Sequence, residues 1–551
     1  MIITDEQLKS LILKDRIIDE KKLQELESLA KDAKIPLAKA LIENDIISDG
    51  NLGVLEADFL KLPFIILSKI SIPEEVFRLV PERIARKQKV VPFARDSNGI
   101  KLAMADPRNI EIQEFVAKKT GEKINVYLST EKDINNILYI YRKDLQKTFD
   151  ELLKKPSISA AEIVDLIINY SYEDKASDVH IEPKENESLI RFRIDGILHD
   201  IAILPKTLHD QITTRIKIMS RLRTDEHLSP QDGKLRVKLP EEDLDIRVSI
   251  IPIADGEKTV LRLLSSHSGQ FSLLDLGMYK EDLNKVTNGF KKSYGMILST
   301  GPTGSGKTTS IYAILKILNT RDINITTIED PIEYRIQGVN QIQTNIKTNL
   351  TFASGLRSIL RQDPNVIFVG EIRDKETAGI AVNAALTGHL VLSTVHTNDA
   401  ATTLPRLTDM DIEPFLVAST VNVIIAQRLI RKICEMCKTS VNITLNELTK
   451  NIPIETVKKH FGNEKEIRIY KGAGCKICHN TGYTGRIGVF EVLEVSKEIK
   501  KLILARSDSD VINSLAIEEG MATMLDDGLE KVRKSITTLE EVLRVTKVES
   551  L

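Results

Sequence analysis

The sequence of 551 residues lacks the features that would place it in a membrane or outside the cell. No stretch approaches the run of about 18 uncharged apolar residues that a membrane-spanning helix requires. The start, MIITDEQLKSLILKDRIIDEKKL, has acids in its first turns and no apolar segment behind a basic leader, so no signal peptide is expected. We therefore expect a cytoplasmic chain that reaches a membrane only through a partner.

The sequence also lacks an excess of charge of either sign, because 77 Lys and Arg nearly balance 79 Asp and Glu. A dedicated nucleic-acid-binding protein normally carries a basic excess. The balance therefore counts against nucleic acid as the main partner, although a local basic patch stays compatible with it. The length is too great for one hydrophobic core and predicts about three or four domains.

Cysteine is scarce, and all four cysteines fall into two C-x-x-C pairs: Cys434 with Cys437, and Cys475 with Cys478. Two such pairs can complete a tetrahedral shell of four thiolates around one Zn²⁺. A cytoplasmic chain is not expected to hold disulfides. Because the flanking charges are evenly mixed, a structural zinc site is favoured. A redox pair, an iron–sulfur cluster and a nucleic-acid-binding knuckle are the alternatives.

Changes of pattern along the chain predict the domain borders. Short strands alternate with helices in the central part, which is typical of a parallel sheet covered on both faces. The predicted parts are an N-terminal regulatory or docking module (1–142, helical over 1–60 and small α/β over 61–142), a linker (143–159), a second α/β domain (160–270), a strand–helix core (271–430), a cysteine insertion (431–486) and a helical end (487–551).

The stretch GPTGSGKT matches the phosphate-binding loop pattern G-x-x-x-x-G-K-[ST] in full, between the strand GMILST and the helix TTSIYAILKIL. Its backbone N–H groups and the positive end of the helix can hold phosphate oxygens. Lys307 can reach the terminal phosphates, and the Thr308 hydroxyl can hold Mg²⁺. The candidate nucleotide-binding residues are Gly301, Pro302, Thr303, Gly304, Ser305, Gly306, Lys307, Thr308, Thr309 and Asp330.

Acidic side chains follow two apolar strands of the same predicted sheet. NVIFVGE ends at Glu371, and ITTIEDPIEY carries Glu329, Asp330 and Glu333. The carboxyl ends of parallel strands meet at one edge of a sheet, so we expect these acids to gather beside the phosphate loop. A helix cap or a solvated turn is the alternative for any single one of them.

Two histidines flank the next apolar strand, in GHLVLSTVHTNDA. A histidine at a strand end is often a structural residue with satisfied hydrogen bonds. His389 precedes the strand and His396 follows it. His396 is therefore placed to sense a terminal phosphate.

With these stretches in place, the sequence resembles the ATPase family that drives type IV pilus assembly and type II secretion. The matching core stretches are GPTGSGKTT, ITTIEDPIEY, SILRQDPNVIFVGEIRD and TGHLVLSTVHTNDA. Upstream, KASDVHIEP, LIRFRIDG, SPQDGKLRV, DIRVSII and TVLRLL look like the second N-terminal domain of the family. The resemblance implies a RecA-like P-loop ATPase core with a parallel central sheet, preceded by a PAS-like α/β domain and an N-terminal helical plus α/β module.

The resemblance also implies a homo-hexamer that hydrolyses ATP between neighbouring subunits and drives an inner-membrane platform protein. The implied cofactors are ATP, Mg²⁺ and Zn²⁺. The N-terminal module would dock on a cytoplasmic or inner-membrane component of the machine. In this family Glu371 is the expected base that orients the attacking water, and Glu329, Asp330 and Glu333 surround the metal and phosphates.

Arg247 and Arg262 match family arginines that reach the nucleotide of the next subunit, and ordinary surface ion pairs are the alternative. The family often has two arginines before PQDG, where this chain has His227 and Leu228. Some N-terminal domains of the family bind cyclic di-GMP through RLG motifs. PLAKALIENDII and LKSLILKDRII lack the Arg and Gly of those motifs, so docking is favoured over dinucleotide sensing.

Three functions remain in competition. A motor for pilus assembly or type II secretion is favoured, with pili ahead of secretion. A nucleic-acid translocating or packaging ATPase would be stimulated by DNA or RNA. A nucleotide-gated adaptor would bind nucleotide without turnover.

Overall fold

The computed structural model describes residues 3–15, 18–20, 23–24, 26–27, 36–43, 46–47, 49–70, 72–138, 145–152, 159–239, 243–264, 272–462, 464, 466–475 and 478–546. The chain divides into two compact units. One consists of Met1–Leu55 and Gly269–Leu551, and the other of Glu56–Ser268.

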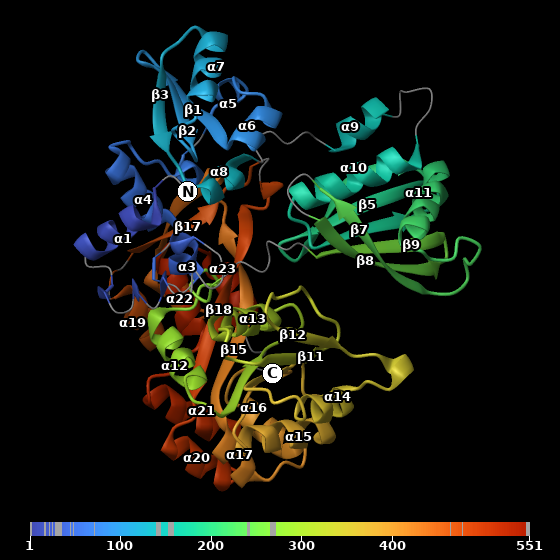
Figure 1. Ribbon diagram of the computed structural model, residues 1–551, viewed down its shortest axis with the longest axis vertical. Coiled ribbons are helices and arrows are strands. Elements are labelled where there is room, and N and C mark those ends of the chain that lie inside the picture. Colours follow the sequence, from blue (N-terminus) through green and yellow to red (C-terminus); the bar gives the residue numbers. More distant parts are fainter. Residues whose placement is uncertain are drawn as a thin grey trace. The chain divides into compact units, whose positions relative to one another are not determined.

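The first unit is built on a seven-stranded sheet in the order β12-β11-β13-β14-β10-β15-β18 (Figure 1). Neighbouring strands are parallel except for β15 and β18, which are antiparallel. The predicted parallel central sheet is thus confirmed. The strands are β10 (Gly295–Thr300), β11 (Ile325–Glu329), β12 (Asn340–Gln343), β13 (Val366–Val369), β14 (Leu390–Val395), β15 (Val421–Ile433) and β18 (Tyr483–Glu494).

Two apolar cores lie on the two faces of this sheet. Met296 and Leu298 of β10 belong to one core and Ile297 to the other, because successive side chains of a strand point to opposite faces. Helices α12 and α13 contribute to the core of Ile297, whereas α14 to α17 and α20 to α23 contribute to the other. The helices are α12 (Lys280–Phe290), α13 (Lys307–Leu318), η4 (Ile346–Thr348), α14 (Phe352–Ile359), α15 (Lys375–Leu386), α16 (Thr403–Asp409), α17 (Pro414–Thr420), α20 (Lys497–Leu504), α21 (Ser509–Glu518), α22 (Met524–Arg533) and α23 (Leu539–Thr546).

The cysteine insertion extends directly from β15 and returns through β18. It contains η5 (Glu435–Cys437), the antiparallel pair β16 (Lys438–Thr444) and β17 (Glu466–Gly472), and helices α18 (Leu445–Thr449) and α19 (Ile454–Phe461). The sequence predicts helix from residue 487 onwards, but β18 continues to Glu494. Pairing with β15 keeps this stretch extended, and the first helix beyond it is α20.

The N-terminal part of the first unit is helical, with α1 (Asp5–Lys14), α3 (Leu37–Glu43) and the start of α4 (Asp49–Leu60). Helix α1 begins in a capping box, in which the Thr4 side chain accepts from the Gln7 N–H and the Gln7 side chain accepts from the Thr4 N–H. Leu8 and Ile12, one helical turn apart, are fully buried in a small apolar core.

The second unit contains two sheets. A three-stranded sheet is formed by β1 (Val90–Asp96), β2 (Gly99–Met104) and β3 (Ile124–Leu128), with η1 (Leu67–Lys69), α5 (Glu74–Phe77), α6 (Glu82–Gln88), α7 (Ile110–Thr120) and α8 (Glu131–Ile137). An antiparallel sheet in the order β6-β5-β4-β9-β8-β7 carries β4 (Asp178–Pro183), β5 (Glu187–Ile194), β6 (Ile197–Pro205), β7 (Gln231–Lys238), β8 (Asp243–Ile253) and β9 (Gly256–Leu264), with α10 (Ala160–Glu173) and α11 (Lys206–Met219).

The predicted linker over 143–159 contains a folded helix, α9 (Leu145–Leu152). Phe149 of α9 is buried in the core of the six-stranded sheet, and the Ile203 N–H donates to the Gln146 side chain over 2.8 Å. This helix therefore packs on the second domain although its sequence is polar. Residues 143–144 and 153–158 of the predicted linker, and the predicted borders at 142 and 270, lie outside the described residues.

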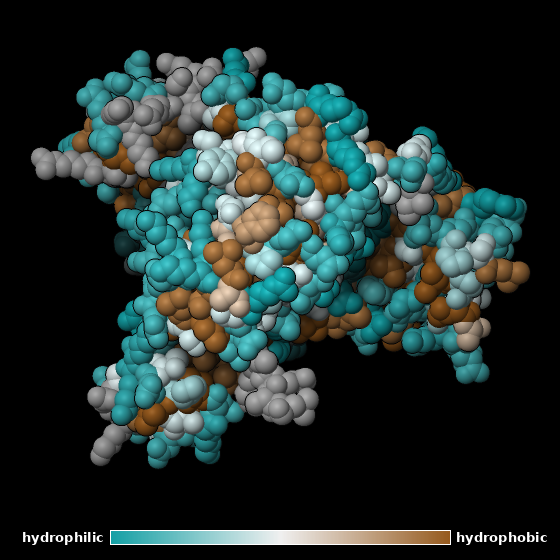
Figure 2. Space-filling view, turned by 90° about the horizontal axis from the view of Figure 1, so that it is seen from below, coloured by the Kyte–Doolittle hydropathy of each residue, from teal (hydrophilic) through white to brown (hydrophobic). Residues whose placement is uncertain are grey.

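Within the described residues, no helix combines the length and apolar character needed to cross a bilayer. Exposed apolar side chains include Phe415 of α17 and Leu504 of α20. Seen from below, the surface shows such residues in small groups among hydrophilic ones (Figure 2).

Candidate functional site

The phosphate loop lies where β10 passes into α13. Gly301, Gly304 and Gly306 have φ angles of 142°, 78° and 89°, which favour glycine and allow the tight turn that the loop makes. Lys307 is buried at the first position of α13, and its ammonium group donates to the Gly301 carbonyl over 2.7 Å. Burial lowers the pKa of Lys307, and the nearby Glu371 opposes that shift. The negative charge of Glu371 therefore favours the charged form of the Lys307 ammonium group.

Glu371 lies just beyond β13 and is largely buried, with 12% of its side chain exposed. Its Oε2 atom lies 3.2 Å from His396 Nε2, and its Oε1 atom lies 2.5 Å from Arg373 Nη2. Both carboxylate oxygens therefore have a basic partner. Of the two histidines that flank β14, His396 lies in this group, whereas His389 Nδ1 lies 3.0 Å from the Ala384 carbonyl at the other end of the strand.

The sheet register brings the predicted groups to a single edge. Ile328 pairs with Val369, and Val369 pairs with Ser393, so β11 and β14 run one and two residues past the end of β13. Thr300 at the end of β10 pairs with Val395 at the end of β14. The phosphate loop, Glu329, Glu371 and His396 consequently follow adjacent strands at one edge.

Glu329 is 2% exposed, and its carboxylate is enclosed by hydrogen-bond donors. Thr327 donates to Oε1 over 2.5 Å, the Tyr312 hydroxyl donates to Oε2, and Gln341 donates to Oε1 over 3.3 Å. Burial raises the pKa of Glu329 despite these donors. Since Tyr312 lies on α13, Glu329 is tied to the helix that begins in the phosphate loop. Asp330 is exposed in the turn that follows.

The sequence reasoning missed Tyr312 and Arg373. Tyr312 looks like an ordinary core aromatic on α13, and its sequence position does not reveal its bond to Glu329. Arg373 could have been found, because in an extended segment residues two apart point to the same side, and Arg373 stands two residues after Glu371.

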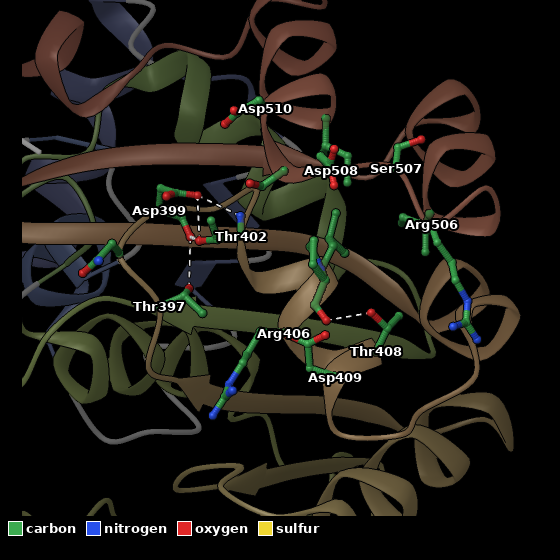
Figure 3. A pocket seen from close by; sticks show the side chains of 16 residues that line it. Thr397, Asp399, Thr402, Arg406, Thr408, Asp409, Arg506, Ser507, Asp508 and Asp510 are labelled. Atoms are coloured by element: carbon green, nitrogen blue, oxygen red, sulfur yellow. Dashed lines mark hydrogen bonds between the residues drawn. The ribbon is translucent and has the colours of Figure 1, made fainter. Parts of the chain in front are cut away.

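A polar cavity of about 810 Å³ adjoins the loop that carries His396 (Figure 3). It is lined by Thr397 and Asp399 of this loop, by α16 and by the turn between α20 and α21. The Asp399 carboxylate accepts from the Thr402 N–H and from the Thr402 hydroxyl, both over 2.8 Å. None of residues 301–308 lines the cavity, so it is separate from the phosphate loop.

Arg247 and Arg262 stand side by side in the second unit. Arg247 on β8 pairs directly with Arg262 on β9, and Lys234 on β7 pairs with Arg247. Like charges placed directly opposite each other destabilise a sheet. Arg262 Nε donates to Asp178 Oδ1 over 2.8 Å, while 62% of the Arg262 side chain stays exposed. A row of cations on adjacent strands is a suitable surface for phosphate groups.

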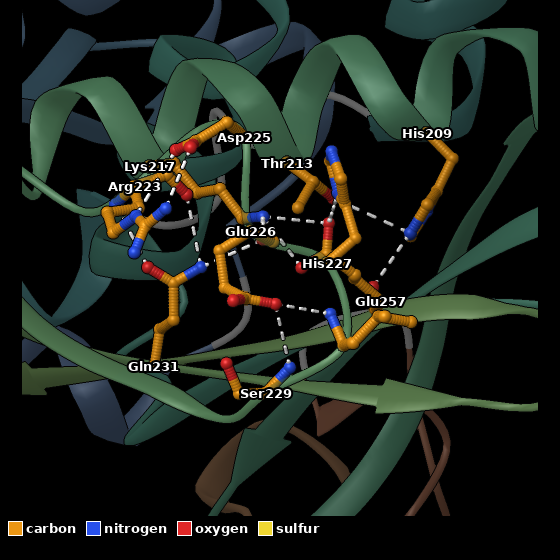
Figure 4. A network of polar contacts seen from close by, with 11 residues as sticks. His209, Thr213, Lys217, Arg223, Asp225, Glu226, His227, Ser229, Gln231 and Glu257 are labelled. Carbon is orange, nitrogen blue, oxygen red and sulfur yellow. Dashed lines mark hydrogen bonds and ion pairs between the residues drawn. The ribbon is translucent and has the colours of Figure 1, made fainter.

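The turn that carries His227 and Leu228, where the family often has two arginines, lies in a network of polar contacts (Figure 4). The fully buried Lys217 ammonium group contacts Glu257 Oε1 over 2.7 Å and donates to the Glu226 carbonyl over 2.6 Å. His227 Nδ1 lies 2.8 Å from Glu257 Oε2. Burial alone would raise the pKa of Glu257, but the bonds from Lys217 and His227 lower it below its ordinary value. Leu228 is 88% exposed at the tip of this turn.

The four cysteine sulfurs converge at the ends of β15 and β18. All four Sγ atoms lie within 4.8 Å of one another. Three of their separations are 3.8 Å (Cys434 to Cys475), 3.9 Å (Cys437 to Cys478) and 3.6 Å (Cys475 to Cys478). A tetrahedral ion with metal–sulfur bonds of about 2.3 Å places its ligands about 3.8 Å apart, whereas a disulfide requires about 2.05 Å. The donor set therefore fits zinc.

Known protein families match two consecutive parts of the chain. Residues 154–544 match the family described as Type II/IV secretion system protein, and residues 60–143 match the MshEN domain. The chain is 36% identical over 562 residues to the type IV pilus assembly ATPase PilB of Myxococcus xanthus, covering 98% of each chain. It is 42% identical over 403 residues to the type II secretion system protein E of Pseudomonas aeruginosa, covering 73% of this chain and 78% of that one.

Among solved structures, the ATPase DotB of Legionella pneumophila shares the fold, with a TM-score of 0.53 at 21% identity. The likeness covers 71% of this chain and 97% of DotB. The family match spans well over half of the chain, and the PilB match spans nearly all of it. The chain belongs to the Type II/IV secretion system protein family.

Proposed function

We propose that this chain is an ATP-hydrolysing motor that powers type IV pilus assembly. The observation that carries the proposal is the contact between Glu371 and His396 at the same sheet edge as a complete phosphate loop. Among the relatives compared, the pilus assembly ATPase aligns over 98% of this chain, whereas the type II secretion protein aligns over 73% of it. Pilus assembly is therefore preferred to assembly of a secretion pseudopilus.

In the proposed reaction, the loop N–H groups and the Lys307 ammonium group hold the terminal phosphates of ATP. Glu371 accepts a proton from the water that attacks the terminal phosphorus, while the bond to the ADP oxygen breaks. His396 and Arg373 each hold one oxygen of the Glu371 carboxylate and so set its direction.

The metal-binding role falls to the Thr308 hydroxyl and the exposed acids Asp330 and Glu333. Oxygen ligands of this kind suit Mg²⁺, which supplies positive charge against the phosphates. The carboxylate of Glu329 is occupied by Tyr312 and Thr327. Glu329 therefore acts in this proposal by fixing α13 rather than by contacting phosphate.

Arg247 and Arg262 complete the site from the neighbouring subunit of a homo-hexamer. Guanidinium groups pair with phosphate oxygens and offset the charge that develops during transfer. The Asp178 carboxylate fixes the Arg262 side chain on its strand. Hydrolysis then depends on contact between subunits, which couples turnover to ring movement.

The remaining parts connect the motor to its machine. The four cysteines hold a structural Zn²⁺ that braces the ends of β15 and β18. The motor acts on an inner-membrane platform protein, and the N-terminal module docks on a cytoplasmic or inner-membrane component. The chain then works at the cytoplasmic side of the inner membrane without nucleic acid.

ATP hydrolysis by the purified chain, compared with Lys307→Ala, tests the proposal. Wild type should hydrolyse ATP, the variant should not, and DNA or RNA should leave the rate unchanged. Nucleotide binding without turnover under conditions that form rings would instead indicate an adaptor. Stimulation by DNA or RNA with a steep salt dependence would indicate a nucleic-acid motor.

A further inference from the structure

Gln427 is a buried amide in the middle of an apolar strand. β15 reads VNVIIAQRLIRKI, and Gln427 is 2% exposed. Burying an amide is costly unless its polar atoms find partners. The partners of Gln427 therefore show what the residue does.

Both polar ends of the Gln427 side chain contact β10 or the phosphate loop. Nε2 donates to the Ser305 carbonyl over 2.8 Å, inside the loop. Oε1 accepts from the Ser299 hydroxyl over 3.4 Å, on the strand that leads into the loop. A single side chain of β15 thus joins β10 to the loop that follows it.

The bond to Ser305 also fixes the direction of a loop N–H. In a planar trans peptide the carbonyl and the next N–H point in opposite directions. Holding the Ser305 carbonyl towards Gln427 turns the Gly306 N–H away from β15. This is the orientation a loop needs if its N–H groups are to face a phosphate group instead of the protein core.

The loop packs directly on this residue. A Cβ atom at Gly301 would collide with the Gln427 backbone carbonyl, and one at Gly306 would lie 3.1 Å from Gln427 Nε2. Both glycines therefore allow the loop to approach β15 closely. The glycine pattern of the loop and the polar residue of the strand depend on each other.

Glu491 has a comparable place on the neighbouring strand. It pairs with Ala426, the residue before Gln427, and is 6% exposed. Its Oε1 atom accepts from the Ala400 N–H over 2.8 Å, in the loop that carries His396. On the other side of that loop, the Thr397 N–H donates to the Thr300 hydroxyl over 2.9 Å. The His396 loop is thus held between β10 and β18.

We propose that Gln427 and Glu491 are positioning residues. Through them the antiparallel strands β15 and β18 hold the phosphate loop and the loop that carries His396 in place. Successive side chains alternate, so the two act on opposite faces of the sheet. Gln427 fixes the loop that binds nucleotide, and Glu491 fixes the loop that bears on the Glu371 carboxylate. The inference rests on the proposed ATPase function and assigns the two residues separable effects.

Gln427→Met keeps the length of the side chain and removes the donor. The Kd for ADP, measured by isothermal titration, should rise about tenfold, the effect of losing about one hydrogen bond. Asn422→Leu is the matched control, because Asn422 is a buried amide on the same strand that donates to the Tyr294 carbonyl over 2.9 Å, at the end of β10 away from the loop. Its Kd should stay within about twofold of wild type.

Glu491→Leu should leave the Kd for ADP unchanged and lower kcat about tenfold, because a misplaced His396 loop affects the reaction more than binding. Glu491→Gln keeps an oxygen acceptor for the Ala400 N–H and should recover most of the lost turnover. A general loss of structure would instead affect both variants and both readouts together.

The outcomes separate this inference from the proposed function. If wild type binds no ADP and hydrolyses no ATP, the proposed function fails. If wild type is active but Gln427→Met binds ADP as wild type does, the role of Gln427 is wrong. If Gln427→Met and Asn422→Leu weaken binding equally, the effect is general destabilisation and the inference is also wrong. If Glu491→Leu hydrolyses ATP with the kcat of wild type, the proposed role of Glu491 is wrong.

Discussion

Glu371 Oε2 and His396 Nε2 lie 3.2 Å apart, although they follow different strands of the sheet. The contact exists because β13 and β14 are parallel neighbours: β14 runs two residues past the end of β13, so Glu371, two residues beyond β13, comes level with the end of β14. Arg373 takes the other carboxylate oxygen. A carboxylate held at both oxygens has one direction in which it can meet a water molecule, and this constraint is the basis of the first prediction.

His396→Ala should lower kcat about tenfold while the Kd for ADP stays unchanged, because the Glu371 carboxylate loses one of its two partners. Steady-state hydrolysis and calorimetric binding measure the two quantities. His389→Ala is the control, since His389 flanks the same strand at its other end. Equal losses in both variants would show that His396 has only a structural role.

Arg247→Ala should abolish hydrolysis in its own rings but regain activity when mixed with Lys307→Ala. In mixed rings some interfaces combine an intact loop from one subunit with intact arginines from its neighbour. Arg236→Ala should hydrolyse ATP at the wild-type rate, because Arg236 is an exposed arginine of the same sheet that pairs with Asp245. Absence of any recovery on mixing would reject a role across subunits.

Purified protein should contain about one equivalent of zinc, measured by plasma mass spectrometry. Cys475→Ser should lose the ion and lower the midpoint of thermal unfolding, because the strands β15 and β18 lose their shared clamp. Less than about half an equivalent of zinc, with full activity, would contradict a structural metal.

Glu491 should make the stability of the fold depend on pH. Burial raises the pKa of Glu491 to about 7, and Asp399 and Asp282 add to the shift, whereas the Ala400 and Met524 N–H groups oppose it. The folded pKa lies above the ordinary value of 4.5, so the folded chain keeps a proton that the unfolded chain releases. This contribution is fully present below about pH 4.5 and is lost as the pH rises through 7.

The loss amounts to about 3 kcal/mol across that window. In Glu491→Gln the side chain no longer titrates, so the variant should gain stability relative to wild type as the pH rises from 5 to 8. Denaturant midpoints at both pH values measure the difference. An unchanged gap between the two proteins would show that Glu491 does not titrate in this range.

The edge of the sheet could be predicted from sequence because parallel strands bring their carboxyl ends together. Once four apolar strands are recognised, the phosphate loop, Glu371 and His396 must approach one another. The cysteine spacing likewise predicted a metal site, although the 37 residues between the pairs say nothing about the final distance between them.

Contacts made by tertiary packing could not be predicted in this way. Glu329 was expected near the metal, but β-strand alternation places it on the same face as Thr327, where Tyr312 meets it. The short apolar run of β18 does not by itself distinguish a strand from a buried helix, and its pairing with β15 keeps it extended. Gln427 is a polar residue in an apolar strand, but only the fold shows that its partner is the phosphate loop.

The most direct test is a pair of measurements on Glu371→Gln: ATP binding and ATP hydrolysis. The amide keeps the size of the side chain but cannot accept a proton, so binding should match wild type while hydrolysis falls at least about a hundredfold. Substantial remaining hydrolysis would contradict the assignment of Glu371 as the group that activates water at the phosphate loop.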